Sequence, residues 1–261
     1  MATAKIARVF GWLLWRDIII LKKNIWGKLL DAFIWSTNYI IINTYIMPFF
    51  GVSPEYGSFI WVGTLVTMAF FESIYCANDI VTDLNGDKTV EHALTLPIPS
   101  WLIFIKMGLS IALNCMALSI FVVPLGKLIL MDRLDLSNFS GIKFILIFIT
   151  INLFFGFFAV WIGSWARDGL RFSYVYRRVV NPLWLFGGYQ FTWMVLHQAF
   201  PRVATIVLFN PLVYAFEGMR VAILGQLGYI NFWISFSVLW VFIIIFALWS
   251  SLWMKKRLDY V

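Results

Sequence analysis

The sequence predicts an all-α membrane protein, because its composition is strongly apolar and six long windows carry almost no charge. Of the 261 residues, 62% are hydrophobic and 13% are charged, whereas a soluble domain is about half apolar and a quarter charged. This balance excludes an ordinary soluble domain. A helix needs about 20 apolar residues to cross the hydrocarbon core, and the windows predict six membrane-spanning helices, at residues 29–50, 57–78, 101–124, 143–166, 178–197 and 229–253.

Lysine and arginine are unevenly distributed among the segments that connect these helices. Six spans place both termini on one side, which then holds most of the basic residues: Lys5, Arg8, Arg16, Lys22, Lys23, Lys28, Lys88, Arg167, Arg171, Arg177, Arg178, Lys255, Lys256 and Arg257. The other side and the adjoining span ends keep Lys127, Arg133, Lys143, Arg202 and Arg220. Because positive charge favours the cytoplasmic side, we expect both termini in the cytoplasm. The net charge of +7 is then a topology signal, and nucleic acid is not an expected partner.

The first 28 residues predict an amphipathic helix at the membrane surface. Basic residues between positions 5 and 23 fall in one arc of about 120°, opposite an apolar face, although Asp17 and Ile19 break the pattern. A basic amphipathic helix that carries Trp12, Trp15 and Trp26 is typical of the inner membrane interface. We therefore expect an interfacial helix over 1–28 that contacts lipid, with a solvated leader as the alternative. We expect no cleaved signal peptide.

The loop at residues 79–100, "DIVTDLNGDKTVEHALTLPIPS", is acidic on an otherwise basic side. Asn85-Gly86 indicates a turn, and Asp87 is placed to cap a short helix that ends before Pro97. The spacing of its acids does not match a calcium loop. The two cysteines and two histidines lie too far apart for a metal-binding pattern. Such an acidic loop fits either a solvated surface or a docking surface.

The same loop resembles the inner loop of ABC-2 type exporter permeases. That family has a Thr-x-Glu-x-x-Leu-x-x-Pro pattern, followed by a lysine in the third span. Here these positions are Thr89, Glu91, Leu94, Pro97 and Lys106. The glycine that usually precedes the threonine is Lys88 in this chain, and the basic residue common after the proline is missing.

A second stretch, "FNPLVYAFEGMRVAILGQ" at 209–226, is similar to the segment before the last span of such permeases. The matching residues are Asn210, Pro211, Leu212, Glu217 and Arg220. With six spans, an amphipathic N-terminus and a length near 260, the resemblance covers essentially the whole chain. We treat residues 1–261 as one transmembrane domain of this kind.

The resemblance implies a permease subunit of an ATP-driven exporter in a bacterial inner membrane. A separate ATPase, which binds ATP and Mg, would dock on 79–100 and on 167–178, through Asp83, Asp87, Glu91, His92, Arg167 and Arg171. Two permease chains and two ATPases would surround a central route and move an amphipathic, lipid-linked, glycan or drug-like substrate outward by alternating access. The chain has no G-x-x-x-x-G-K-[ST] loop, the pattern that cradles nucleotide phosphates. We therefore expect no cofactor, no metal site and no catalytic residue in it.

Residues 198–226 predict a re-entrant hairpin on the outer side, before the last span. Asn210 is a good N-cap, Pro211 suits the first helical position, and Gly225 can end the helix. The helix between them has about 14 residues, or roughly 21 Å, too short for the roughly 30 Å core. Glu217 and Arg220 lie one turn apart and can pair there. We expect Asn210, Pro211, Glu217 and Arg220 to form an outer gate.

Glu72 is the only acid well inside a predicted span. An ionisable group at that depth indicates function by default, but a simple bond near the inner interface fits equally well. A secondary transporter or channel that does not depend on ATP is the main alternative function, and it would need more such groups or an inverted repeat. A membrane-embedded enzyme would need a motif such as H-E-x-x-H or G-x-S-x-G, and the sequence has neither.

Overall fold

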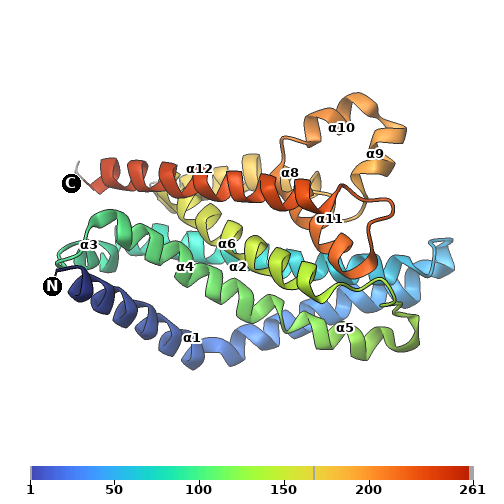
Figure 1. Ribbon diagram of the computed structural model, residues 1–261, viewed down its shortest axis with the longest axis horizontal. Helices are drawn as coiled ribbons and strands as arrows, with labels where there is room; N and C mark the ends of the chain where they lie inside the picture. The colour runs from blue at the N-terminus through green and yellow to red at the C-terminus, as the bar shows by residue number, and fades with distance from the viewer. Residues whose placement is uncertain (1, 167, 259–261) are drawn as a thin grey trace.

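The computed structural model describes residues 2–166 and 168–258, and these are almost entirely helical. Helix accounts for 83% of the structure, and no strand occurs in the described ranges. The long helices are α1 (Ala2–Ile41), α2 (Tyr56–Asn85), α4 (Ser100–Ser119), α6 (Gly141–Trp165) and α12 (Phe232–Leu258). They run roughly along the long axis of the molecule (Figure 1). The predicted all-α class is confirmed.

Shorter helices connect or extend these five. They are a π-helix at Ile42–Ile46, a 3-10 helix at Met47–Phe50, α3 (Thr89–Leu94), α5 (Val122–Leu130), a 3-10 turn at Met131–Arg133, α7 (Gly169–Val175), a π-helix at Tyr176–Val180, α8 (Asn181–Leu185), α9 (Trp193–Ala199), α10 (Pro201–Val207) and α11 (Pro211–Leu224). The start of α1, the end of α12 and α3 lie at the same end of the bundle (Figure 1). We call this the inner end and the opposite one the outer end.

Four helices in the described ranges are long and apolar enough to cross a membrane. They are Tyr56–Asn85, Ser100–Leu130 (α4 with α5), Gly141–Trp165 and Phe232–Lys255, which correspond to four of the six predicted spans. The pair α10 and α11 meets the same test only if it is taken together, and it is bent by 95°. Length and composition therefore support four or five spans, below the predicted six.

The first departure from prediction is α1, which runs without a break from Ala2 to Ile41. The sequence predicts an interfacial helix over 1–28 and a separate span over 29–50. That separation is wrong, because no proline lies between them and a single glycine such as Gly27 costs only about 1 kcal/mol in a helix. The helix instead changes direction part-way along its length (Figure 1).

The second departure is the predicted fifth helix at 178–197. Helical structure that starts with α7 stops at Leu185, and residues 186–192 form an irregular segment before α9. Gly188 has a φ of +88° in this segment, a left-handed conformation that glycine adopts without steric cost. Two neighbouring glycines, Gly187 and Gly188, thus outweigh the absence of charge in this window. Beyond the break, α9 and α10 project from the bundle (Figure 1).

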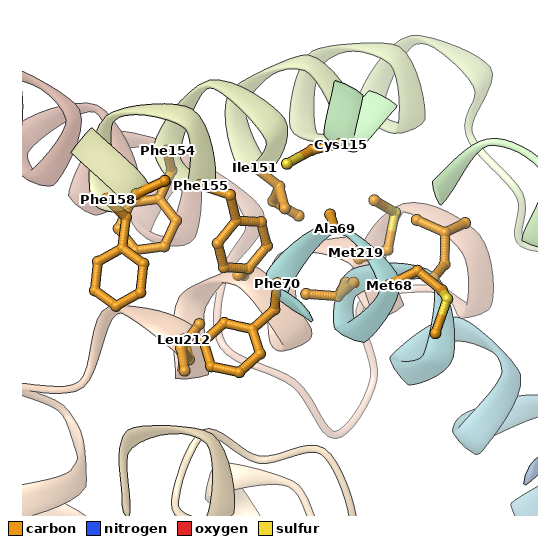
Figure 2. Packing of buried hydrophobic residues seen from close by; sticks show 14 of the residues in the cluster. Met68, Ala69, Phe70, Cys115, Ile151, Phe154, Phe155, Phe158, Leu212 and Met219 are labelled. Atoms are coloured by element: carbon orange, nitrogen blue, oxygen red, sulfur yellow. The ribbon is translucent and has the colours of Figure 1, made fainter. Parts of the chain in front are cut away.

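The core of the bundle is built around α6. Figure 2 shows Phe154, Phe155 and Phe158 of α6 packed toward Phe70 of α2, with residues of α4 and α11 around them. Helices α4 and α6 approach so closely that a Cβ atom on Gly156 would lie 2.2 Å from a backbone oxygen of α4. Small residues at such contacts are a usual feature of membrane helix packing. Every residue of α11 except the last is buried, so this element lies inside the bundle.

Candidate functional site

A cavity of about 910 Å³ lies between α1, α2, α7 and the π-helix that follows α7. We call it the inner cavity. Its charged lining consists of Lys28, Asp31, Glu72, Asp79 and Arg177. Apolar and aromatic side chains line the rest, among them Ala32, Trp35, Met68, Phe71, Phe172 and Tyr176. The cavity therefore offers both charged groups and aromatic rings to a ligand.

Glu72 is the one buried residue among the charged residues that line this cavity. It lies 16 residues into α2, or about 24 Å along that helix, and its side chain is only 5% exposed. Lys28 of α1 forms an ion pair with it, and the thiol of Cys76 lies 3.6 Å from the same carboxylate oxygen. The acid that the sequence singles out is thus held by a base from a different helix.

A second ion pair joins α1 to α4. Asp17 pairs with Lys106, and the two side chains are 14% and 10% exposed. Asp17 is one of the two residues that interrupt the amphipathic pattern of the N-terminal segment, and its contact with α4 explains this interruption. The pair borders a cavity of about 520 Å³ that also touches Asp83 and Asp87 in the inner loop.

The inner loop contains the short helix α3, as the sequence predicts, but its capping residue differs. Asp83, near the end of α2, accepts hydrogen bonds from the main-chain N–H groups of Thr89 and Val90, both at 3.0 Å. The hydroxyl of Thr89 donates to the same carboxylate. The predicted cap, Asp87, is therefore wrong. The chain turns back through Lys88, at φ +55°, and this turn aims the first N–H groups of α3 at Asp83.

The other predicted docking residues lie around α3 or on α7. Glu91 forms an ion pair with Lys88 at 3.4 Å, and Asp87 and His92 are exposed. Arg171 is also exposed on α7, where its main-chain N–H donates to Asp168 at 2.8 Å. The structure brings Asp83, Asp87, Glu91 and His92 together in one loop and places Arg171 on a separate helix. Arg167 lies outside the described residues.

The outer stretch folds locally as predicted. Asn210 accepts a hydrogen bond from the N–H of Leu212 at 3.0 Å, Pro211 opens α11, and Gly225 ends it with a φ of +102°. Asn210 also donates to the carbonyl of Leu183 at 2.6 Å, which ties the start of α11 to the middle of α8. The 14-residue length of α11 agrees with the prediction.

Glu217 and Arg220 are both fully buried, but the pair predicted between them does not form. No ion pair within 4.0 Å joins the two side chains, both of which lie in the described part of the chain. Glu217 accepts from the main-chain N–H groups of Trp193 and Ile230, at 2.8 and 2.9 Å. Arg220 donates to the carbonyls of Gly188 and Tyr189, at 2.6 and 2.7 Å. The loops on either side offer these polar groups at close range, so both charges bond to main chain.

Comparison with known proteins decides the family. A model of the ABC-2 type transporter family matches residues 8–224, from the first turns of α1 to the end of α11. The chain belongs to the ABC-2 type transporter family. No curated protein gave a significant match. ABC-2 membrane domains are permease components, and the ATPase of such a transporter is a separate subunit.

The contacts that sequence reasoning missed in this ABC-2 permease are those made by α1. Lys28 was assigned to the inner basic segments, and Asp17 appeared only as an irregularity. The sequence held a signal for both contacts. Lys28 and Asp17 are charges next to apolar sequence, and each has an opposite charge in a predicted span: Glu72 for Lys28 and Lys106 for Asp17.

No group of three or more His, Cys, Asp or Glu residues in the described ranges is placed to hold a metal ion.

Proposed function

We propose that this ABC-2 permease exports an amphipathic substrate through a route that begins at the inner cavity. The observation that carries the proposal is the combination of charged groups and aromatic rings on one face of α1, α2 and α7. Ionisable groups at membrane depth are costly against lipid and normally face a cavity or a water-filled route. A face of this kind suits a transport route better than it suits contact with lipid chains.

A second copy of the chain would complete that route. Two-fold pairing is the commonest symmetric assembly, and it would bring two such faces together around one pathway. Each copy would carry one ATPase on the inner loop and α7, where Asp83, Asp87, Glu91, His92, Arg167 and Arg171 are the proposed docking residues. ATP and Mg would be bound by the ATPase subunits.

The mixed lining of the inner cavity supports an amphipathic or lipid-linked substrate, including a glycan or drug-like one. Aromatic rings such as Trp35 and Phe71 provide apolar and stacking contact, and Lys28, Glu72 and Arg177 provide charge at the same surface. A purely apolar molecule would leave the charges unsatisfied. A small ion would make no use of the rings.

The proposed arrangement has both termini in the cytoplasm of a bacterial cell, with the inner end facing inward. The first half of α1 would then lie near the inner membrane surface. The bent pair α10 and α11 would be the re-entrant element at the outer end, because irregular backbone at that depth needs protein around it.

The experiment that tests this function is purification of the tagged permease from its native cells in mild detergent, followed by mass spectrometry. We expect a near-stoichiometric partner that contains a phosphate-binding loop. Glu91→Lys should release that partner, since it reverses a charge in the proposed docking loop. Asp135→Lys, the matched control, reverses an exposed charge after α5 at the opposite end and should retain it.

Two results would contradict the proposal. The first is a permease that purifies alone even after crosslinking through the inner loop. The second is transport in reconstituted vesicles that follows a proton gradient and ignores ATP, which would favour a secondary transporter.

A further inference from the structure

Five aromatic rings lie between the inner cavity and the outer end of the molecule. Trp35 and Phe71 line the cavity itself. Trp35 stacks on Tyr39 with ring centroids 4.4 Å apart, and Phe71 contacts Trp184 at 5.5 Å. Tyr39 and Trp184 both contact Tyr189, at 5.7 and 5.6 Å. We call these five rings the aromatic cluster, and it fills the space directly beyond the cavity.

Tyr189 is the member of the cluster that lies furthest from the inner end along these contacts. It belongs to the irregular segment 186–192, and it is only 2% exposed. Its ring packs against Gly63 of α2, where a Cβ atom would lie 2.9 Å from the ring. Its hydroxyl is 3.3 Å from the hydroxyl of Thr64. The side chain thus fits a space that α2 leaves open at a glycine.

Two side chains of α11 fix the main chain on which Tyr189 is carried. Arg220 donates to the carbonyls of Gly188 and Tyr189, and Glu217 accepts from the N–H of Trp193. These three bonds hold the segment near its middle and at its far end. The hydroxyl of Tyr56 also donates to the carbonyl of Gln190 at 3.0 Å. Beyond Gly187 the segment has no helical hydrogen bonds, so these side chains define its path there.

We propose that Tyr189 is the gate of the transport route and that Arg220 and Glu217 are positioning residues that keep it closed. The inference rests on the proposed export function, which makes the inner cavity part of a route. Opening moves the segment 186–192 away from α2. Its adjacent glycines, Gly187 and Gly188, allow the large change in backbone angles that such a hinge needs.

The test measures access to the inner cavity from the outer side. Tyr75 lines the cavity, is exposed and lies one turn beyond Phe71 toward the inner end, so Tyr75→Cys is the reporter. Intact cells receive a membrane-impermeant maleimide, and labelling is divided by the value after permeabilisation. The parent chain without the reporter gives the background from Cys76 and Cys115, which are both buried.

Tyr189→Ala and Arg220→Ala are the test variants, each combined with the reporter. A closed gate opens in a minor state populated at about 0.1–10%, so the loss of closure should raise the outside labelling rate about tenfold or more. Tyr189→Phe keeps the ring and should stay protected. Arg220→Lys keeps the charge but has one nitrogen in place of the two that bond the carbonyls of Gly188 and Tyr189, and it should give an intermediate rate.

Arg133→Ala is the matched control, because Arg133 also holds a main-chain carbonyl near the outer end, that of Thr44 at 2.9 Å, but does not touch the segment. It should leave the reporter protected. If Arg220→Ala fails to accumulate, Arg220→Lys and Tyr189→Ala decide the matter. Unchanged protection in Tyr189→Ala overturns the proposal. Labelling needs neither substrate nor ATPase, so this result is independent of whether the permease exports its substrate.

Discussion

The two ends of the bundle stabilise buried charge in different ways. At the inner end, side chain pairs with side chain: Lys28 with Glu72 and Asp17 with Lys106. Both pairs tie α1 to another helix. At the outer end, two buried charges of α11 form their hydrogen bonds with main-chain groups of neighbouring segments, and Arg220 also lies over the ring of Phe59, 3.6 Å from its centroid.

This difference determines which substitutions of the charged residues each end tolerates. An ion pair between side chains keeps its attraction when the two charges are exchanged. A carboxylate bonded to N–H groups, or a guanidinium bonded to carbonyls, has no such freedom, because an acceptor and a donor are not interchangeable. The inner pairs thus join one helix to another, whereas the two outer charges define the path of a loop.

Exchange of Glu217 and Arg220 is the change with the largest expected effect. Each single reversal leaves a buried charge facing main-chain groups of the wrong polarity, at about 3–5 kcal/mol of unfolding free energy. The double exchange should recover none of this loss. The measurement is unfolding of the purified permease in mixed detergent micelles. Recovery of most of the loss in the double variant would show that attraction between the two side chains outweighs their main-chain hydrogen bonds.

Exchange of Lys28 and Glu72 should behave in the opposite way. Glu72→Lys alone places two like charges together, and we expect a loss of about 2–3 kcal/mol, less than a fully buried pair because Lys28 is 35% exposed. The double exchange should restore at least half of that loss. The same unfolding assay gives the coupling free energy by a double-mutant cycle. Strictly additive losses would mean that the pair contributes nothing specific.

Asp17→Asn should have a smaller effect, since the amide keeps an oxygen that accepts a hydrogen bond from Lys106. The loss of the charge alone should cost about 1–2 kcal/mol. Arg16→Gln is the control, because Arg16 also contacts Asp17 but its side chain is 57% exposed; such surface changes usually stay within about 0.5 kcal/mol. An effect of Asp17→Asn no larger than this control would argue against a structural role for the bond to α4.

Local signals in the sequence predicted α11 correctly, from its Asn210 cap to its Gly225 end. The residues that define these boundaries are neighbours in the chain, so their spacing is enough. The predicted fifth span was wrong because one of two conflicting local signals was given too little weight. Its Gly187-Gly188 break was visible, but the absence of charge in that window suggested a continuous helix.

The candidate site depended on contacts that spacing cannot predict. Glu72 stood out as a lone acid, yet its partner Lys28 comes from another helix, and no local pattern connects the two. Glu217 and Arg220 were predicted as a pair because they lie one turn apart. The loops that bond them instead approach only once the whole bundle has folded. The docking roles of Asp83, Asp87, Glu91, His92, Arg167 and Arg171 stay predictions.

The smallest expected effect lies in the inner loop and is a gain in stability. Lys88 adopts φ +55° and ψ +35°, a left-handed conformation that costs a residue with a side chain about 1–2 kcal/mol. Lys88→Gly removes this cost but gives up an exposed ion pair with Glu91 worth about 0.2–0.5 kcal/mol and makes the unfolded chain more flexible, so we expect a net gain of about 0.5–1 kcal/mol. Lys88→Ala loses the same ion pair and keeps the strained backbone, and it should be slightly destabilising. Unfolding in mixed micelles compares the two variants, and equal stabilities would show that the turn imposes no backbone cost at this position.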